Sequence, residues 1–194
     1  MIAARFAAQR SAAFPRFTHA SLVAAWLILL CSGCHREDRV RLAVESAFSE
    51  AGRHSVASVS GTDWRVAAVD YMDRGIPADL PPEDLLRLAR ECGSRELQFP
   101  DDDDVYRVAF ACRSVIVDRL ARGETSESMN ALVRMLVDDS LGIDGELRLS
   151  VVVAILRRPE TAAPALTRAS RDHPSRSTEL EALARKCEGG LKGP

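Results

Sequence analysis

The sequence predicts an all-α protein, built as an irregular helical-repeat solenoid or as a helical bundle of about seven helices. Apolar residues recur at spacings of three and four along most of the chain beyond residue 35, which is the pattern of amphipathic helices. Three segments with similar starts follow one another at intervals of 42 and 41 residues, as a repeated pair of helices requires. The chain has 194 residues, 46% of them hydrophobic and 28% charged, and is long enough to bury a core.

Residues 1–33 differ from the rest of the chain because they contain three arginines and no acidic residue. An apolar run at 20–30 follows these arginines. A basic start followed by a short apolar run is typical of an export signal. The run has about 11 residues, whereas a helix that crosses a bilayer needs about 20.

The apolar run leads into small residues before a cysteine, Ser32-Gly33-Cys34, and here the sequence resembles a bacterial lipoprotein signal. The resemblance implies cleavage before Cys34, a diacylglycerol thioether on its sulfur and acylation of the new amine. Two or more acyl chains anchor a protein stably to a membrane. His35 stands where the family's inner-membrane retention signal has aspartate, which favours the outer membrane. A plain cleaved signal and an uncleaved anchor are the alternatives.

We therefore expect four parts in the chain. They are a signal peptide at 1–33, a lipidated N-terminus with one amphipathic helix and a linker at 34–61, an α-helical repeat-like domain at 62–188 and a disordered tail at 189–194. Cleavage removes three positive charges from a chain of net charge -2, so the mature protein is mildly acidic. This balance disfavours nucleic acid as a partner.

The first predicted helix covers 35–51, where apolar residues lie three or four positions apart. These residues are Val40, Val44, Ala47, Phe48 and Ala51. Glycine and serine are frequent at 52–61, which predicts a linker. The last predicted helix covers 178–187, before the glycine-rich end of the chain.

The segments that begin alike lie at 63–68, 104–109 and 146–150, and an arginine stands near the start of each one. These arginines are Arg65, Arg107 and Arg148. A second helical stretch with its own start signal follows each segment. The signals are prolines and acids at 81–84, Thr125 or Ser126 as a cap, and Pro159-Glu160.

These pairs of stretches resemble HEAT-like helical repeats over about residues 62–173. The resemblance implies that the three arginines are structural and pair with acids such as Asp104 and Asp144 between stacked helices. A row of arginines that binds a partner along one face is the alternative.

The valine-rich segment 147–156 has two readings. It could be a buried strand, because β-branched residues are frequent in sheets. Its length and spacing instead favour a helix packed on two sides. One side would carry Leu147, Val151, Ala154 and Ile155, and the other Leu149, Val152 and Leu156.

Reactive side chains do not form a recognisable catalytic or metal-binding motif in the sequence. The acidic run at 101–104 directly precedes an apolar-periodic segment, where carboxylates cap a helix and complement its dipole. Cys92 and Cys112 lie outside any catalytic motif and have the character of buried small hydrophobic residues. We therefore expect no enzyme activity, no metal site and no cofactor.

We also expect Cys92 and Cys112 to be unpaired. A hairpin of helices at 82–93 and 103–122 would place Cys112 about 12 Å deeper than Cys92, at about 1.5 Å per residue. The Cα atoms of a disulfide lie within about 7 Å of each other.

Aromatic and arginine side chains are the candidate partner-binding residues, since tryptophan, tyrosine and arginine are frequent hot spots of interfaces. They are Trp64, Tyr71, Tyr106, Arg65, Arg107 and Arg148. For the aromatic residues, packing in the core is the alternative role.

Together these features predict a membrane-anchored periplasmic lipoprotein that acts as a non-catalytic protein–protein interaction module, a scaffold or assembly factor of an envelope complex. The alternative is an inhibitor or immunity protein that neutralises a periplasmic toxin or hydrolase. The expected partner is another periplasmic or envelope protein, and the membrane is contacted through the lipid on Cys34.

Overall fold

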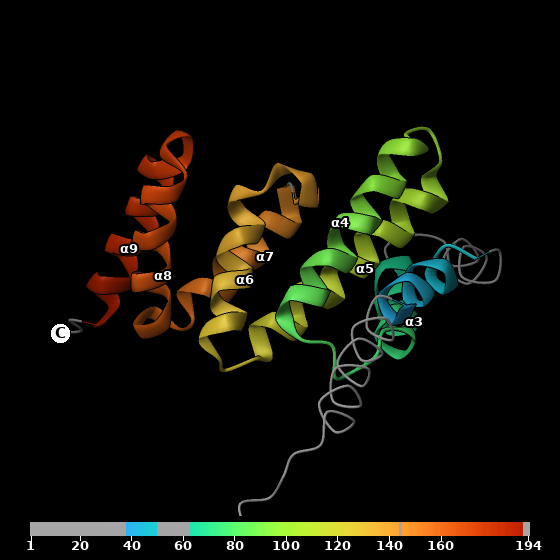
Figure 1. Ribbon diagram of the computed structural model, residues 1–194, viewed down its shortest axis with the longest axis horizontal. Helices are drawn as coiled ribbons and strands as arrows, with labels where there is room; N and C mark the ends of the chain where they lie inside the picture. Colours follow the sequence, from blue (N-terminus) through green and yellow to red (C-terminus); the bar gives the residue numbers. More distant parts are fainter. Residues whose placement is uncertain (1–37, 50–62, 144, 192–194) are drawn as a thin grey trace, which may run out of the picture. The chain divides into compact units, whose positions relative to one another are not determined.

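The computed structural model describes residues 38–49, 63–143 and 145–191, and within these ranges it contains eight α-helices, two 3₁₀ helices and no strand (Figure 1). The first helix covers 38–47. The others are α3 (Asp63–Gly75), α4 (Pro82–Gln98), α5 (Asp103–Arg122), α6 (Ser126–Val137), η1 (Asp139–Leu141), α7 (Gly145–Leu156), α8 (Pro159–Asp172), η2 (Pro174–Arg176) and α9 (Ser177–Leu191). The prediction of an all-α fold is confirmed. The predicted signal peptide and Cys34 lie outside the described residues.

The helices from α3 to α8 stack in two layers. In one layer α3 packs on α5 and α5 on α7, and in the other α4 packs on α6 and α6 on α8. Successive helices join the layers, since α5 also contacts α4 and α6, and α7 contacts α6 and α8. α9 lies against α8 (Figure 1). Packing of each helix on the next but one is the arrangement that a repeated helix pair produces.

The predicted start signals cap the helices. The carboxylate of Asp102 accepts hydrogen bonds from the backbone amides of Asp104 at 3.0 Å and Val105 at 3.1 Å, which begins α5. The hydroxyl of Thr125 accepts from the amide of Ser128 at 3.1 Å at the start of α6. Prolines stand in the first turn of α4 and of α8, where no amide donor is needed. The acidic run at 101–104 therefore has a structural role in starting α5.

α5 lies at the centre of the core, because it contacts α3, α4, α6 and α7. Its buried residues include Val108, Val115, Ile116 and Leu120. Burial of a side chain of this size contributes about 1.5–3 kcal/mol. The position of α5 therefore determines how its four neighbours are placed.

The valine-rich segment is helix α7, as its spacing predicts, but two of its large apolar side chains are exposed. Leu147, Val151 and Ile155 are buried. Leu149 is 63% exposed and Val153 is 40% exposed. Val152 and Leu156 of the predicted second side are partly buried and pack against the core, as expected, whereas the expectation that Leu149 packs there is wrong.

The two ends of the described chain also differ from the sequence prediction. The helix over 38–47 contributes Val40 and Val44 to the same core as the later helices, so it packs with the repeat-like helices. α9 continues to Leu191, beyond the predicted boundary of the tail at 188. Glycine lowers helix propensity by about 1 kcal/mol without excluding helical dihedral angles, and the buried Cys187 holds this last part of α9 in place.

α4 is longer than predicted, and this changes the position of two cysteines. The predicted end at 93 put Cys92 next to the turn, but α4 continues to Gln98 through Gly93, which packs closely against the backbone of Ser140. Cys92 therefore lies well inside the hairpin of α4 and α5. Its Sγ atom is 2.8 Å from that of Cys112. Both thiols are free, as expected, but the expected separation of the two residues is wrong.

The substitution Asp102→Ala is expected to lower the free energy of unfolding by about 1 kcal/mol, because it removes the acceptor of two backbone amides. Asp101→Ala is the matched control, since it removes the same charge from an exposed neighbouring side chain. We expect the control to change this free energy by less than about 0.5 kcal/mol. Urea unfolding followed by circular dichroism measures both, and equal losses would contradict a capping role.

Candidate partner-binding surface

Three aromatic side chains meet where α3 packs on α5. The rings of Trp64 and Phe110 lie edge to face, with their centroids 5.8 Å apart and their planes at 63°. Tyr106 lies one turn before Phe110 on α5, and the centroids of these two rings are 6.2 Å apart. Ring pairs of this geometry contribute about 0.5–1.5 kcal/mol beyond their burial.

Two arginines lie over these rings. The Cζ atom of Arg65 is 5.7 Å from the ring centroid of Trp64 and 5.1 Å from that of Phe110. The Cζ atom of Arg107 is 5.3 Å from the ring centroid of Trp64. A guanidinium within about 6 Å of a ring is attracted to its face. We call Trp64, Arg65, Tyr106, Arg107 and Phe110 the aromatic–arginine cluster.

The cluster is open to solvent on its outer side. Tyr106 is 42% exposed and Arg65 is exposed, while Trp64 and Arg107 are half-buried above the buried ring of Phe110. An apolar base with aromatic and guanidinium groups at its rim has the composition of an interface hot spot.

A groove between α5 and α7 adjoins the cluster. Arg65 of the cluster forms an ion pair with Glu146, and Glu146 also lines the groove. Along α5, Phe110 of the cluster is followed by Ser114 and Val117 of the groove at spacings of four and three, so these residues lie along one face of the helix. The cluster and the groove therefore form one surface, which α3, α5 and α7 build together.

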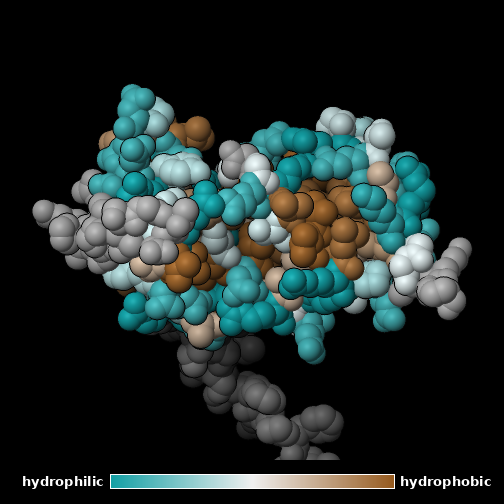
Figure 2. Space-filling view, turned by 180° about the vertical axis from the view of Figure 1, so that it is seen from behind, coloured by the Kyte–Doolittle hydropathy of each residue, from teal (hydrophilic) through white to brown (hydrophobic). Residues whose placement is uncertain are grey.

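The groove has a volume of about 470 Å³. Its lining on the α7 side includes Leu149, Ser150 and Val153, and the two apolar members of this set are the exposed large hydrophobic residues of that helix. Apolar side chains also gather in a broad patch on the face that Figure 2 shows. Contiguous exposed apolar surface of this kind often marks a site of interaction.

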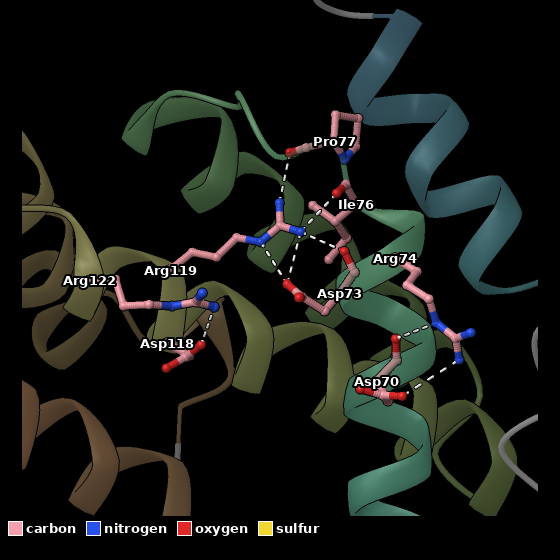
Figure 3. A network of polar contacts seen from close by, with 8 residues as sticks. All are labelled: Asp70, Asp73, Arg74, Ile76, Pro77, Asp118, Arg119 and Arg122. Atoms are coloured by element: carbon pink, nitrogen blue, oxygen red, sulfur yellow. Dashed lines mark hydrogen bonds and ion pairs between the residues drawn. The ribbon is translucent and has the colours of Figure 1, made fainter.

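The position of α3 on α5 depends on Arg119, which binds the C-terminal end of α3 (Figure 3). Its guanidinium donates to the carbonyl oxygens of Asp73 at 2.7 Å, Ile76 at 2.8 Å and Pro77 at 2.7 Å. It also donates to the carboxylate of Asp73 at 2.9 and 3.0 Å. The last carbonyls of a helix lack partners within the helix, and one planar guanidinium binds that of Asp73 in the last turn of α3 together with those of the two residues after the helix.

The structure brings four of the six predicted residues together in the cluster: Trp64, Arg65, Tyr106 and Arg107. Tyr71 lies about two turns after Trp64 on α3 and packs against the core. Arg148 donates to the carbonyl of Leu136 at 3.1 Å and pairs with Glu179, so it joins α7 to α6 and α9.

Two of the predicted arginines pair with acids that the sequence analysis does not name. Arg65 pairs with Glu146 and Arg148 pairs with Glu179. The acids at the start of α5 serve its capping, and Asp144 lies outside the described residues. The arginines are partly structural, as the repeat pattern implies, but their partners come from helices that the repeat period does not identify.

Sequence reasoning missed Phe110 and the groove. Phe110 stands four positions after Tyr106, and this spacing indicates that the two rings lie on the same face of a helix. Leu149 and Val153 have the same spacing on α7, but a continuous apolar pattern does not distinguish a helix with an exposed side from one that is packed all round.

Within the described residues, no group of three or more histidine, cysteine, aspartate or glutamate side chains lies close enough to hold a metal ion. None of the helices in this part of the chain has the length and apolar character needed to span a membrane. Comparison with protein-family models, with curated proteins and with solved structures finds no match.

The substitution Arg119→Ala is expected to lower the free energy of unfolding by about 3 kcal/mol, because the end of α3 loses its donors in a site where the arginine is only 12% exposed. Arg119→Lys keeps the charge but loses the planar fork, so an intermediate loss is expected. Thermal or urea unfolding measures both.

Arg122→Ala is the matched control on the same helix. Its side chain is 63% exposed and pairs with Asp118 one turn earlier (Figure 3). A loss below about 0.5 kcal/mol is expected for this exposed pair. A loss for Arg119→Ala no larger than that for Arg122→Ala would show that Arg119 does not hold α3.

Proposed function

We propose that this chain is a non-catalytic protein–protein interaction module, held at the periplasmic side of a membrane by a lipid on Cys34. In this role it is a scaffold or assembly factor of an envelope complex. The partner is another periplasmic or envelope protein, which binds across the aromatic–arginine cluster and the groove between α5 and α7.

The observation that carries this proposal is the exposed cluster of tryptophan, tyrosine and arginine beside an apolar groove. Tryptophan, tyrosine and arginine dominate the energetics of interfaces, and they act best beside apolar contacts that exclude water. The side chain of Arg107 lies on the ring of Trp64, and the exposed Tyr106 precedes it on α5. A partner surface with apolar residues and one or more carboxylates complements this arrangement.

The partner-binding proposal is tested by a pull-down from envelope extract with the full chain as bait, followed by a titration with the captured protein. Trp64→Ala is expected to weaken binding at least tenfold, since truncation of a hot-spot residue costs about 2 kcal/mol or more. Tyr106→Ala is expected to weaken it less, because Tyr106 lies at the rim of the cluster.

Leu97→Ala is the matched control for this experiment, because Leu97 is a large exposed hydrophobic residue on α4, in the other layer of helices. It is expected to leave the affinity unchanged. The proposal fails if Trp64→Ala binds as well as the unaltered chain. It also fails if the chain captures no protein and instead turns over a small-molecule, peptide or glycan substrate.

The anchoring proposal predicts that Cys34→Ala abolishes incorporation of a fatty-acid analogue and releases the protein from the membrane fraction. Cys31→Ala is the control, since it removes a thiol three residues earlier and leaves Ser32-Gly33-Cys34 intact. Metabolic labelling and sequencing of the mature N-terminus measure the outcome. Label retained in Cys34→Ala, or a mature N-terminus other than Cys34, would exclude a lipid at this position.

A further inference from the structure

Two buried thiols lie in contact away from the proposed binding surface. The Sγ atoms of Cys92 on α4 and Cys112 on α5 are 2.8 Å apart, and both residues are fully buried. A disulfide bond is about 2.05 Å long, so the two sulfurs need to approach by less than about 1 Å to form one. The third cysteine of the described residues, Cys187, is buried on α9, which packs against α8.

Other roles for this pair fit the surroundings less well. Metal binding needs further ligands, and no group of three or more possible ligands lies together in the described part of the chain. A nucleophilic role needs a thiolate that substrate can reach. Burial, followed by the hydrogen bond with Cys112, raises the pKa of the Cys92 thiol well above its usual range. Both thiols are therefore out of reach of a substrate, and that of Cys92 is not activated for attack.

We propose that Cys92 and Cys112 are a disulfide-forming pair that links α4 to α5 covalently in an oxidising compartment. The oxidant is an external disulfide, either a small one such as glutathione disulfide or that of a thiol–disulfide oxidoreductase. One cysteine thiolate attacks the external disulfide and forms a mixed disulfide, and the second cysteine thiolate then displaces the remaining external sulfur. In sum, two S–H bonds are lost and one S–S bond forms, while the external disulfide takes up two electrons and two protons and leaves as two thiols.

The burial of the pair determines when this reaction takes place. The external disulfide does not reach two fully buried sulfurs in the closed hairpin, so exchange takes place while the chain folds or when α4 and α5 open locally. Once formed, the bond is shielded from reductants by the same packing. Reduction of the folded protein is therefore expected to be slow and to speed up in denaturant.

The expected consequence is a more stable hairpin at the centre of the fold. The two cysteines are 20 positions apart in the sequence, so the bond restricts a loop of that length in the unfolded chain. For a loop of this size the ratio of folded to unfolded protein is expected to rise on the order of a hundredfold. Because α5 carries Tyr106, Arg107 and Phe110, the same bond also ties the cluster's main helix to α4.

Peptide mapping of the full chain tests the proposal directly. The reduced, urea-denatured chain is refolded in a buffer of reduced and oxidised glutathione, free thiols are alkylated, and the protein is digested with trypsin without reduction. Cys92 then lies in the peptide 91–95 and Cys112 in the peptide 108–113. The expected result is that nearly all chains yield these two peptides joined, with Cys187 alkylated.

The matched control is Cys187→Ala, which removes a buried thiol but keeps the pair. It is expected to give the same joined peptide, whereas Cys112→Ala gives alkylated Cys92. Urea unfolding of the unaltered chain, oxidised and reduced, provides the second measurement and needs no substituted chain. Its expected result is the hundredfold difference in the ratio of folded to unfolded protein.

The proposal is overturned if Cys92 and Cys112 are both alkylated in the refolded chain, or if either is joined mainly to Cys31, Cys34 or Cys187. It is also overturned if the joined peptides form but the oxidised and reduced chains unfold at the same urea concentration. The test uses neither a partner nor a membrane anchor, so its outcome is independent of the proposed function.

Discussion

The contact between Arg119 and the end of α3 is the interaction on which the candidate surface depends. α3 packs on α5, and one guanidinium from α5 binds carbonyl oxygens in the last turn of α3 and in the two residues that follow it. A helix of 13 residues is rigid enough that fixing one end limits the movement of the other. Trp64, at the start of α3, is thereby kept opposite Phe110 of α5. The polar contact at the end of α3 and the aromatic contact at its start therefore both fix the position of this helix on α5.

α5 uses two other arginines in a similar way. Arg107 lies on the ring of Trp64 of α3, and Arg113 is buried and pairs with Glu96 of α4. Gly142 leaves the space that Arg113 needs, because a Cβ atom there would collide with its guanidinium, and the residue has φ 61°, which favours glycine. Arg107, Arg113 and Arg119 of α5 therefore bind neighbouring elements through directional contacts, in addition to the apolar core.

The sequence predicts the helices well because their signals are local. Asp102 and Thr125 cap the helices that follow them, as their positions before apolar-periodic segments indicate. The ends of helices are predicted less well, because tertiary contacts decide them. Gly93 resembles a stop signal, yet it lies inside α4, where a Cβ atom would come within 3.2 Å of the backbone oxygen of Ser140. α4 ends five residues later than predicted, so Cys92 lies more than one turn further from the turn between α4 and α5. The predicted distance between Cys92 and Cys112 is therefore too large.

The sequence predicts which types of residue form the candidate site, but it does not predict which individual residues meet there. Tryptophan, tyrosine and arginine are recognisable as interface residues from their chemistry alone. Which of these residues meet depends on the packing of α3 on α5 and of α5 on α7. A repeat period predicts the order of the helices, but it does not predict how each helix is rotated about its own axis. Tyr71 shares a helix with Trp64 but packs against the core, and Arg148 is occupied by Glu179.

The contrast between α7 and its neighbours is the strongest reason to regard the exposed apolar residues as functional. On α6 the exposed positions are Ser126, Glu127 and Arg134, and on α8 they include Glu160 and Arg168, so the outer sides of both helices are mainly polar. α7 instead exposes Leu149 and Val153 one turn apart. Its buried side already contributes Val151 and Ile155 to the core, so the fold does not need apolar residues on the outer side as well. Leu149 and Val153 differ from a single exposed apolar residue such as Leu97 because they lie together along one groove, and contiguous apolar surface of this kind supports the proposal that another molecule packs there.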